Sequence, residues 1–194
     1  LASDASGNGN TGTLLGGPVW TAGKTGGALR FDGVDDRVDV GDPADLRIVG
    51  NITMAAWVCA EATNGRRCIL TKGYTWDPPG EVDLSIRDGT FYTGSWNGIG
   101  QGAWVPMLAE DVGRWVHLAG TYDGSAWRLY RNGVLVCATN NSVGAVSVNA
   151  GWTLGSRGGR AGVDMRYFKG MLDDVRLYNR ALSPVEIAAL AEEK

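Results

Sequence analysis

The sequence has 194 residues, an apolar fraction of 44% and a formal net charge of −3 at neutral pH. This charge leaves no broad cationic surface, which argues against sequence-independent binding to nucleic acid. No apolar run approaches the ~18 residues of a membrane-spanning helix, so we expect no membrane insertion. The length suits one all-β domain, and we expect a single domain over residues 1–194. Because the chain starts at Leu1 rather than methionine, we also expect a larger multidomain parent protein.

Short β-runs separated by turn residues fill most of the chain. Asp88-Gly89 and Asn132-Gly133 are typical of tight hairpin turns, since two-residue turns need positive φ angles. Ser183 and Glu186 form a capping-box pattern, which predicts a helix after Ser183. The expected strands are residues 28–32, 37–41, 52–60, 67–71, 81–87, 90–95, 115–122, 127–131, 134–138, 152–155 and 170–178. Together they predict an all-β fold: an antiparallel two-sheet jelly-roll sandwich with one short C-terminal helix.

Three long segments between strands, residues 72–80, 96–114 and 156–169, are predicted to be loops. Loops of this length in compact domains are usually functional or disordered. The first two carry aromatic residues that are candidate sugar-stacking platforms, namely Tyr74, Trp76, Trp96 and Trp104. The alternative is that each tryptophan packs its own loop against the sandwich. Four other tryptophans, Trp20, Trp57, Trp115 and Trp127, fit strand patterns and are expected in the core.

Several arginines lie near the same segments. Guanidinium groups match carboxylate and sulfate oxygens in a planar fork, so arginine is suited to acidic sugars. The candidates are Arg66 and Arg67, or Arg157 and Arg160. The alternative for each of them is a solvated surface position.

Four segments together resemble laminin-G-like and pentraxin-like domains. They are the Asp-x-Ser-Gly-Asn opening at residues 4–12, residues 27–33 followed by 52–58, residues 115–133, and residues 170–187. The resemblance implies the concanavalin-A-type jelly roll, a secreted or cell-surface location, and a glycan-binding or adhesion role. Pentraxins carry a core disulfide where this chain has Ala55 and Ala119. Their two-calcium cluster would fall in residues 156–169, where this chain offers only Asp164.

The resemblance also favours one structural calcium ion. Calcium prefers six to eight oxygen ligands, and Asp4 and Asn8 of the opening could provide some of them. Asp173 and Asp174 of the last strand would complete the set if the first and last strands are neighbours. The alternative is an Asx turn at Asp4 and solvated aspartates at 173 and 174. Asp32 and Asp36 are the weaker candidates for calcium ligands, and we expect them to be turn formers.

Catalytic patterns are incomplete in this sequence. Glu81 and Asp83 begin a Glu-x-Asp-x-x-Glu pattern of the laminarinase type, but the last position is Ile86. Retaining glycosidases need a pair of carboxyl groups about 5–5.5 Å apart. His117 fits a core strand, and Cys137 has no second histidine to activate it. We therefore expect a non-catalytic module.

Three functions are compatible with these patterns. The first is a glycan-binding module of a larger secreted or cell-surface protein, with the glycan or another cell-surface ligand as its partner. The second is a protein-adhesion or spacer domain, and the third is a glycan-degrading enzyme of the same fold. Cys59 and Cys68 flank a predicted turn and either form a disulfide across a hairpin or remain buried thiols.

Overall fold

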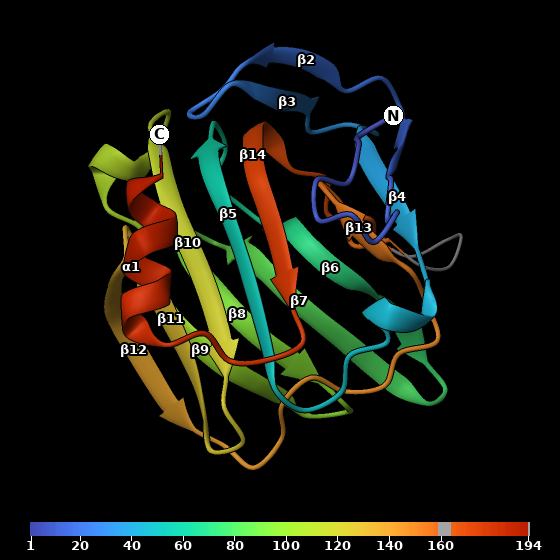
Figure 1. Ribbon diagram of the computed structural model, residues 1–194, viewed down its shortest axis with the longest axis vertical. Helices are drawn as coiled ribbons and strands as arrows, with labels where there is room; N and C mark the ends of the chain where they lie inside the picture. The colour runs from blue at the N-terminus through green and yellow to red at the C-terminus, as the bar shows by residue number, and fades with distance from the viewer. Residues whose placement is uncertain (159–163, 194) are drawn as a thin grey trace.

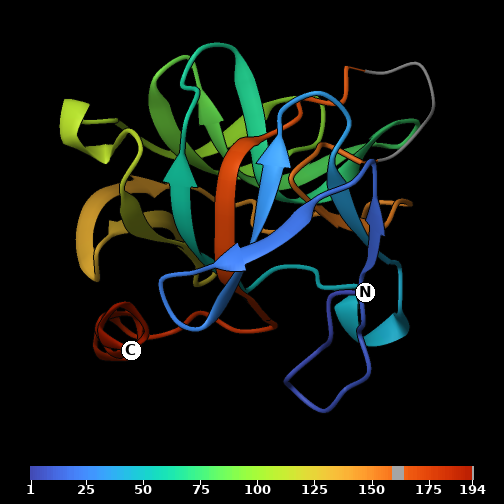
Figure 2. The same cartoon turned by 90° about the horizontal axis from the view of Figure 1, so that it is seen from above.

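The structure is a computed structural model that describes residues 1–158 and 164–193. Its strands form two seven-stranded sheets that face each other across one core (Figures 1 and 2). One sheet, the β6–β9 sheet, has the order β1-β4-β13-β6-β7-β8-β9. Its strands are β1 (Thr13–Leu15), β4 (Arg37–Gly41), β13 (Trp152–Leu154), β6 (Arg66–Trp76), β7 (Pro79–Arg87), β8 (Thr90–Trp96) and β9 (Gly100–Pro106).

The other sheet, the β5–β14 sheet, has the order β12-β11-β10-β5-β14-β3-β2. Its strands are β12 (Val134–Asn140), β11 (Ala126–Arg131), β10 (Trp115–Tyr122), β5 (Ile52–Ala60), β14 (Lys169–Tyr178), β3 (Gly27–Asp32) and β2 (Val19–Ala22). All pairings are antiparallel. Short 3-10 turns, η1 (Ala44–Leu46) and η2 (Ala109–Asp111), lie in the connections. The predicted jelly-roll sandwich is confirmed.

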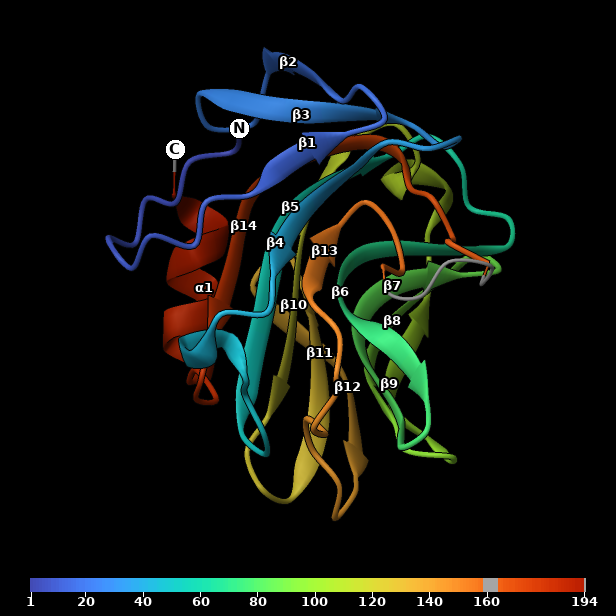
Figure 3. The same ribbon diagram turned by 90° about the vertical axis from the view of Figure 1, so that its right-hand side faces the viewer.

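The single α-helix of the described residues, α1 (Pro184–Glu192), begins at the predicted capping box, where Glu186 N–H donates to the Ser183 hydroxyl. It lies on the outer side of the β5–β14 sheet, away from the β6–β9 sheet (Figure 3). Ile187 packs there against Ala55 and Ala119, which are cross-strand partners in β5 and β10. Small side chains at these two positions therefore leave room for the helix. Across residues 1–158 and 164–193, no helix is long and apolar enough to cross a membrane.

Two of the expected connections differ in the structure. Cys59 lies in β5 and Cys68 in β6, which belong to opposite sheets, so the expected hairpin between them does not exist. Both thiols are free and buried. The segments 72–80 and 96–114 are not long loops, because β6, β7 and β9 extend into them.

Candidate functional site

The site lies on the outer face of the β6–β9 sheet. Alternate residues of β7 point into the core between the sheets, as Val82 and Leu84 do with no exposed surface. Their neighbours Glu81, Asp83 and Ser85 point the other way, yet all three are at most 2% exposed. Polar side chains on an outer face are buried only if something covers them. Here arginines and aromatic rings form that cover.

Three aromatic residues form a shelf at one end of this face, which we call the aromatic shelf: Tyr74, Trp76 and Trp96. The ring centroids of Tyr74 and Trp96 are 5.2 Å apart and stacked, and those of Trp76 and Trp96 are 5.8 Å apart. Trp76 is 71% exposed. A tryptophan in contact with two rings but open to solvent has a fixed face to offer to a ligand.

The shelf is carried by strands and not by loops. Tyr74 and Trp76 end β6, and Trp96 ends β8. The chain turns at residues 77–78, where the Thr75 hydroxyl donates to the Pro78 carbonyl at 2.8 Å. The expectation that these residues lie in loops is thus wrong, although the exposure of Trp76 is as expected for a binding platform.

Trp104 occupies a separate position on the same face. It lies on the edge strand β9, opposite Tyr92 of β8, and is 58% exposed. In the same register Trp96 pairs with Gly100, which lies four residues before Trp104 on β9. Four residues of strand span about 13 Å. Trp104 therefore does not belong to the aromatic shelf. Trp20 is also not in the core as expected, since it is 53% exposed on the edge strand β2.

Next to the shelf lies a hollow of about 180 Å³ that we call the arginine pocket. It is lined by Arg66, Arg87, Arg157, Tyr74, Tyr92, Trp96, Glu81 and Gly100. Arg157 holds Glu81 with two hydrogen bonds, Nε to Oε1 at 2.7 Å and one Nη to Oε2 at 3.0 Å. Arg166 donates to the same carboxylate at 3.2 Å. The Arg157 guanidinium also lies 3.6 Å from the Tyr74 ring centroid, which joins the pocket to the shelf.

A second ion pair forms the floor of the pocket. Arg87 contacts both carboxylate oxygens of Asp83, at 2.9 and 3.1 Å, and its guanidinium lies 3.2 Å from the centre of the Tyr92 ring. The Tyr92 hydroxyl donates to the Gln101 carbonyl at 2.9 Å, and burial raises the pKa of Tyr92 well above its usual range. A Cβ at Gly102 would lie 2.7 Å from the Tyr92 ring, so glycine is needed for the ring to lie on the sheet.

Arg66 differs from the other arginines in the pocket. Its Nε is buried, and within the described part of the chain no group accepts a hydrogen bond from it. It lies directly across from Arg87 in the β6–β7 pairing. Burial lowers the pKa of Arg66, and the nearby Arg87 and Arg166 lower it further. Arg67, the other candidate of the pair, donates instead to the Asn64 and Tyr167 carbonyls; Arg160 lies outside the described residues.

A larger hollow, of about 350 Å³, lies elsewhere and involves Asp42, Ile48 and Lys72. Its buried cation is already neutralised, because Lys72 Nζ lies 2.6 Å from the Asp42 carboxylate. Among the described residues, no exposed aromatic ring lines it. We therefore take the smaller arginine pocket, together with the shelf, as the candidate site.

Comparison with known proteins identifies the family. Residues 31–188 match a family model, Laminin_G_3, described as "Concanavalin A-like lectin/glucanases superfamily". The chain belongs to this family. A search of curated proteins gives no match. The resemblance to laminin-G-like domains is thereby confirmed.

Solved structures with a similar fold include domains of several different proteins. Domain 4 of AbnA, a GH43 extracellular arabinanase from Geobacillus stearothermophilus, was solved with arabinotriose; it is 25% identical, with a TM-score of 0.71, covering 98% of this chain and 92% of that domain. The binding domain of Paraclostridial Mosquitocidal Protein 1 has a TM-score of 0.77 at 16% identity, covering 97% of this chain and 48% of the other. A SAP-like pentraxin from Limulus polyphemus has a TM-score of 0.59 at 16% identity, covering 85% of this chain and 81% of the other.

The expected calcium ligands of this concanavalin-A-like chain have separate partners. The Asp4 carboxylate accepts from Ser6 and Asn10 N–H groups at 2.9 Å, an Asx-turn arrangement, and Asn8 donates to Ser6. β1, the strand that follows this opening, pairs with β4, whereas the last strand, β14, pairs with β3 and β5. Asp173 accepts from Thr25 N–H at 2.8 Å, and Asp174 pairs with Arg176 at 2.7 Å.

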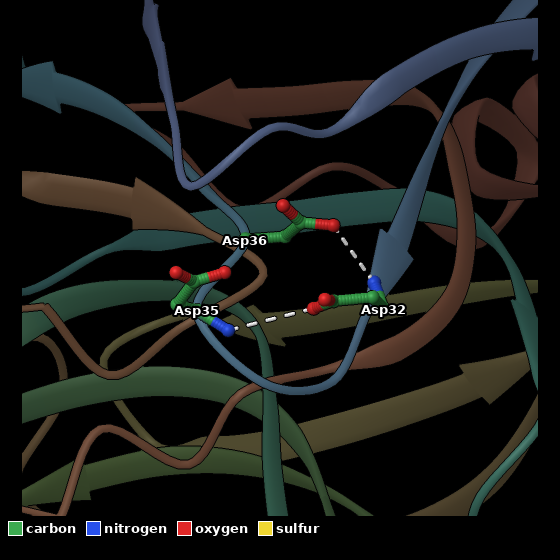
Figure 4. Close-up of side chains that lie close together, drawn as sticks. All are labelled: Asp32, Asp35 and Asp36. Atoms are coloured by element: carbon green, nitrogen blue, oxygen red, sulfur yellow. Dashed lines mark hydrogen bonds between the residues drawn. The ribbon is translucent and has the colours of Figure 1, made fainter.

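A different acidic cluster is present in the turn between β3 and β4 (Figure 4). Asp32, Asp35 and Asp36 each offer a carboxylate oxygen within 4.8 Å of the others. Asp32 accepts from the N–H of Val34, and Asp36 accepts from the N–H of Asp32 at 2.8 Å, as expected of turn formers. Burial raises the pKa of Asp36, and the charges of Asp32 and Asp35 raise it further.

The residues considered for catalysis have structural partners. Glu81 and Asp83 point to the same face, but arginines occupy both carboxylates. His117 is 1% exposed and packs edge-on against Trp57, with ring centroids 5.3 Å apart. Its Nδ1 has no hydrogen-bond partner in the described residues, so it is buried as expected but not satisfied. Burial lowers the pKa of His117 to about 4.

Proposed function

We propose that this chain is a non-catalytic glycan-binding module of a larger secreted or cell-surface protein, and that the aromatic shelf is its sugar-stacking surface. The observation that carries the proposal is Trp76, which is 71% exposed while its ring is fixed against Trp96. A large apolar ring exposed beside a pocket lined by directed polar groups is the arrangement that sugar rings require. The arabinotriose complex of the Geobacillus domain supports a carbohydrate ligand for this fold.

The shelf is suited to binding because it is rigid before the ligand arrives. Its three rings stand at the ends of paired strands, and the Arg157 guanidinium packs over the face of the Tyr74 ring while it also binds Glu81. Few side chains have to be ordered on binding, which lowers the entropic cost of association. A spacer role without any ligand gives no reason to expose Trp76.

The experiment is the substitution Trp76→Ala, assayed by affinity electrophoresis and calorimetry against arabinan and a panel of other plant and bacterial polysaccharides. We expect loss of retention with a nearly unchanged melting temperature, because the side chain is mostly exposed. The matched control is Trp20→Ala, which removes a tryptophan of similar exposure from β2 in the other sheet. Wild-type retention by Trp76→Ala, or equal loss in both variants, would exclude the shelf as the binding surface.

A structural calcium ion belongs to the same proposal. The Asp32, Asp35 and Asp36 cluster fits a hard cation, because its three carboxylates converge and repel one another. The alternative calcium ligands, expected from the sequence, are Asp4, Asn8, Asp173 and Asp174. Calcium at either place would brace the turns of the sandwich and would not contact a glycan on the shelf.

A further inference from the structure

The arginine pocket contains more positive charge than its own carboxylates neutralise. Four guanidinium groups lie in or next to it, on Arg66, Arg87, Arg157 and Arg166, and they face two carboxylates, on Glu81 and Asp83. A further carboxylate nearby, on Asp164, is 79% exposed and lies 3.9 Å from Arg166. Because solvent screens the Asp164 carboxylate, a pair at this distance neutralises little of the charge.

The excess charge is localised on Arg66. Glu81 is shared by two arginines and Asp83 is held by a third. Both carboxylates raise the pKa of Arg66, but among the described residues none forms an ion pair with it. A like-charged arginine lies directly opposite it across the strands, an arrangement that destabilises a sheet. A half-buried cation without a partner is costly for folding, and an incoming anion would offset that cost.

The pocket also adjoins the aromatic shelf. Trp96 and Tyr74 belong to both, so a sugar on the shelf can direct a substituent at Arg66. The guanidinium fork matches the two oxygens of a carboxylate, and it also accepts a sulfate ester. Neutral sugars offer hydroxyl groups, which do not compensate the charge.

We propose that the arginine pocket is a subsite for an anionic sugar unit, with Arg66 as the residue that binds its carboxylate or sulfate group. This inference rests on the proposed glycan-binding function, which it narrows to acidic glycans. The ion pairs of Arg157 with Glu81 and of Arg87 with Asp83 hold the side chains that line the pocket in place, and the shelf supplies the stacking surface. Arg66 thus sets specificity, and the aromatic shelf supplies affinity common to all sugars.

The experiment compares binding of three ligands, an oligogalacturonate, its carboxyl-reduced neutral counterpart and a sulfated galactan oligosaccharide, to the protein and its variants. For Arg66→Gln we expect affinity for the preferred anionic ligand to fall about tenfold or more, with binding to the neutral one unchanged. Arg66→Lys should recover part of the loss, since an ammonium group keeps the charge but not the fork. Arg114→Gln removes an exposed arginine outside the pocket and should change nothing. The two anionic arms distinguish a carboxylate from a sulfate ligand.

The outcomes separate this inference from the proposed function. If Trp76→Ala abolishes binding while the neutral and acidic ligands bind equally well, the glycan function stands and the anionic subsite is refuted. A second measurement covers the case in which no oligosaccharide binds: thermal stabilisation by free galacturonate or by sulfate. If either anion raises the melting temperature and Arg66→Gln abolishes that rise, the subsite is supported and the glycan function is left without support. If neither anion raises the melting temperature, the subsite is refuted. Arg66→Gln should not lower the melting temperature in the absence of ligand, and a marked fall would show that Arg66 has a structural partner.

Discussion

Replacing Glu81 with glutamine removes the carboxylate that Arg157 and Arg166 share. The side chains of Glu81 and Arg157 are only 3% and 9% exposed, so solvent cannot replace the lost partner. Removing one member of a buried pair leaves an uncompensated charge and costs about 3–5 kcal/mol. The cost should lie toward the upper part of this range, because two guanidinium groups lose their partner in a pocket that already holds Arg66.

Urea unfolding followed by tryptophan fluorescence measures this cost, since eight tryptophans report on the fold. For a chain of this size each kcal/mol corresponds to about 2–4 °C in melting temperature, so we expect a fall of about 6–20 °C. The control is Glu61→Gln, which breaks the more exposed pair with Arg30 and should cost less than about 1 kcal/mol. If both variants lose the same small amount, the Glu81 pair is not a buried network and the description of the pocket is wrong.

Two further predictions concern other parts of the sandwich. In the folded protein the pKa of His117 is about 4, below the ordinary value of 6.5. Between pH 4 and 6.5 the unfolded chain therefore binds more protons than the folded one. The free energy of unfolding should fall as pH drops from 6.5 toward 4, by at most about 3 kcal/mol. His117→Gln should remove this slope from a pH series of urea unfolding curves, and an unchanged slope would contradict the assignment. If calcium binds at the β3–β4 turn, chelation should lower the melting temperature of the wild type but not of Asp36→Asn. If Asp173→Ala, and not Asp36→Asn, removes the sensitivity to chelator, the ion is bound by the set that contains Asp4, Asn8, Asp173 and Asp174. Identical melting curves with and without chelator would exclude both calcium sites.

Much of the fold is predictable because local signals agree with the tertiary structure. The capping box at Ser183, the alternation of Val82, Leu84 and Ile86, and the Asn132-Gly133 turn each identify an element without reference to the rest of the chain. The strands β1, β2 and β9 escape prediction because they lie at or near sheet edges, where one face is solvated and the apolar pattern is weak.

The site is only partly predictable for a related reason. Composition identifies Tyr74, Trp76 and Trp96 but places them in loops, because Gly73 and the prolines at 78 and 79 resemble loop punctuation. Tyr74 and Trp76 in fact precede the β6–β7 hairpin turn, and Trp96 precedes the β8–β9 turn. The ion pairs of Glu81 and Asp83 with arginines include tertiary contacts between residues as much as 85 positions apart, which no local pattern contains. The alternation of acidic residues in β7 is a local signal that its outer face carries polar groups.

The arginine pocket contains both ion pairs that stabilise the fold and an arginine that does not. Paired carboxylates at Glu81 and Asp83 hold three arginines in place, and this arrangement leaves the fourth, Arg66, without a partner in the described residues. A protein selected for stability alone would place an apolar residue or a carboxylate at that position, since either removes the repulsion with Arg87. Residues that destabilise a fold are typical of binding sites, because the ligand provides the compensating interaction. Under the proposed function the same argument applies to Trp76, because a bound sugar would cover the face of the ring that solvent now contacts.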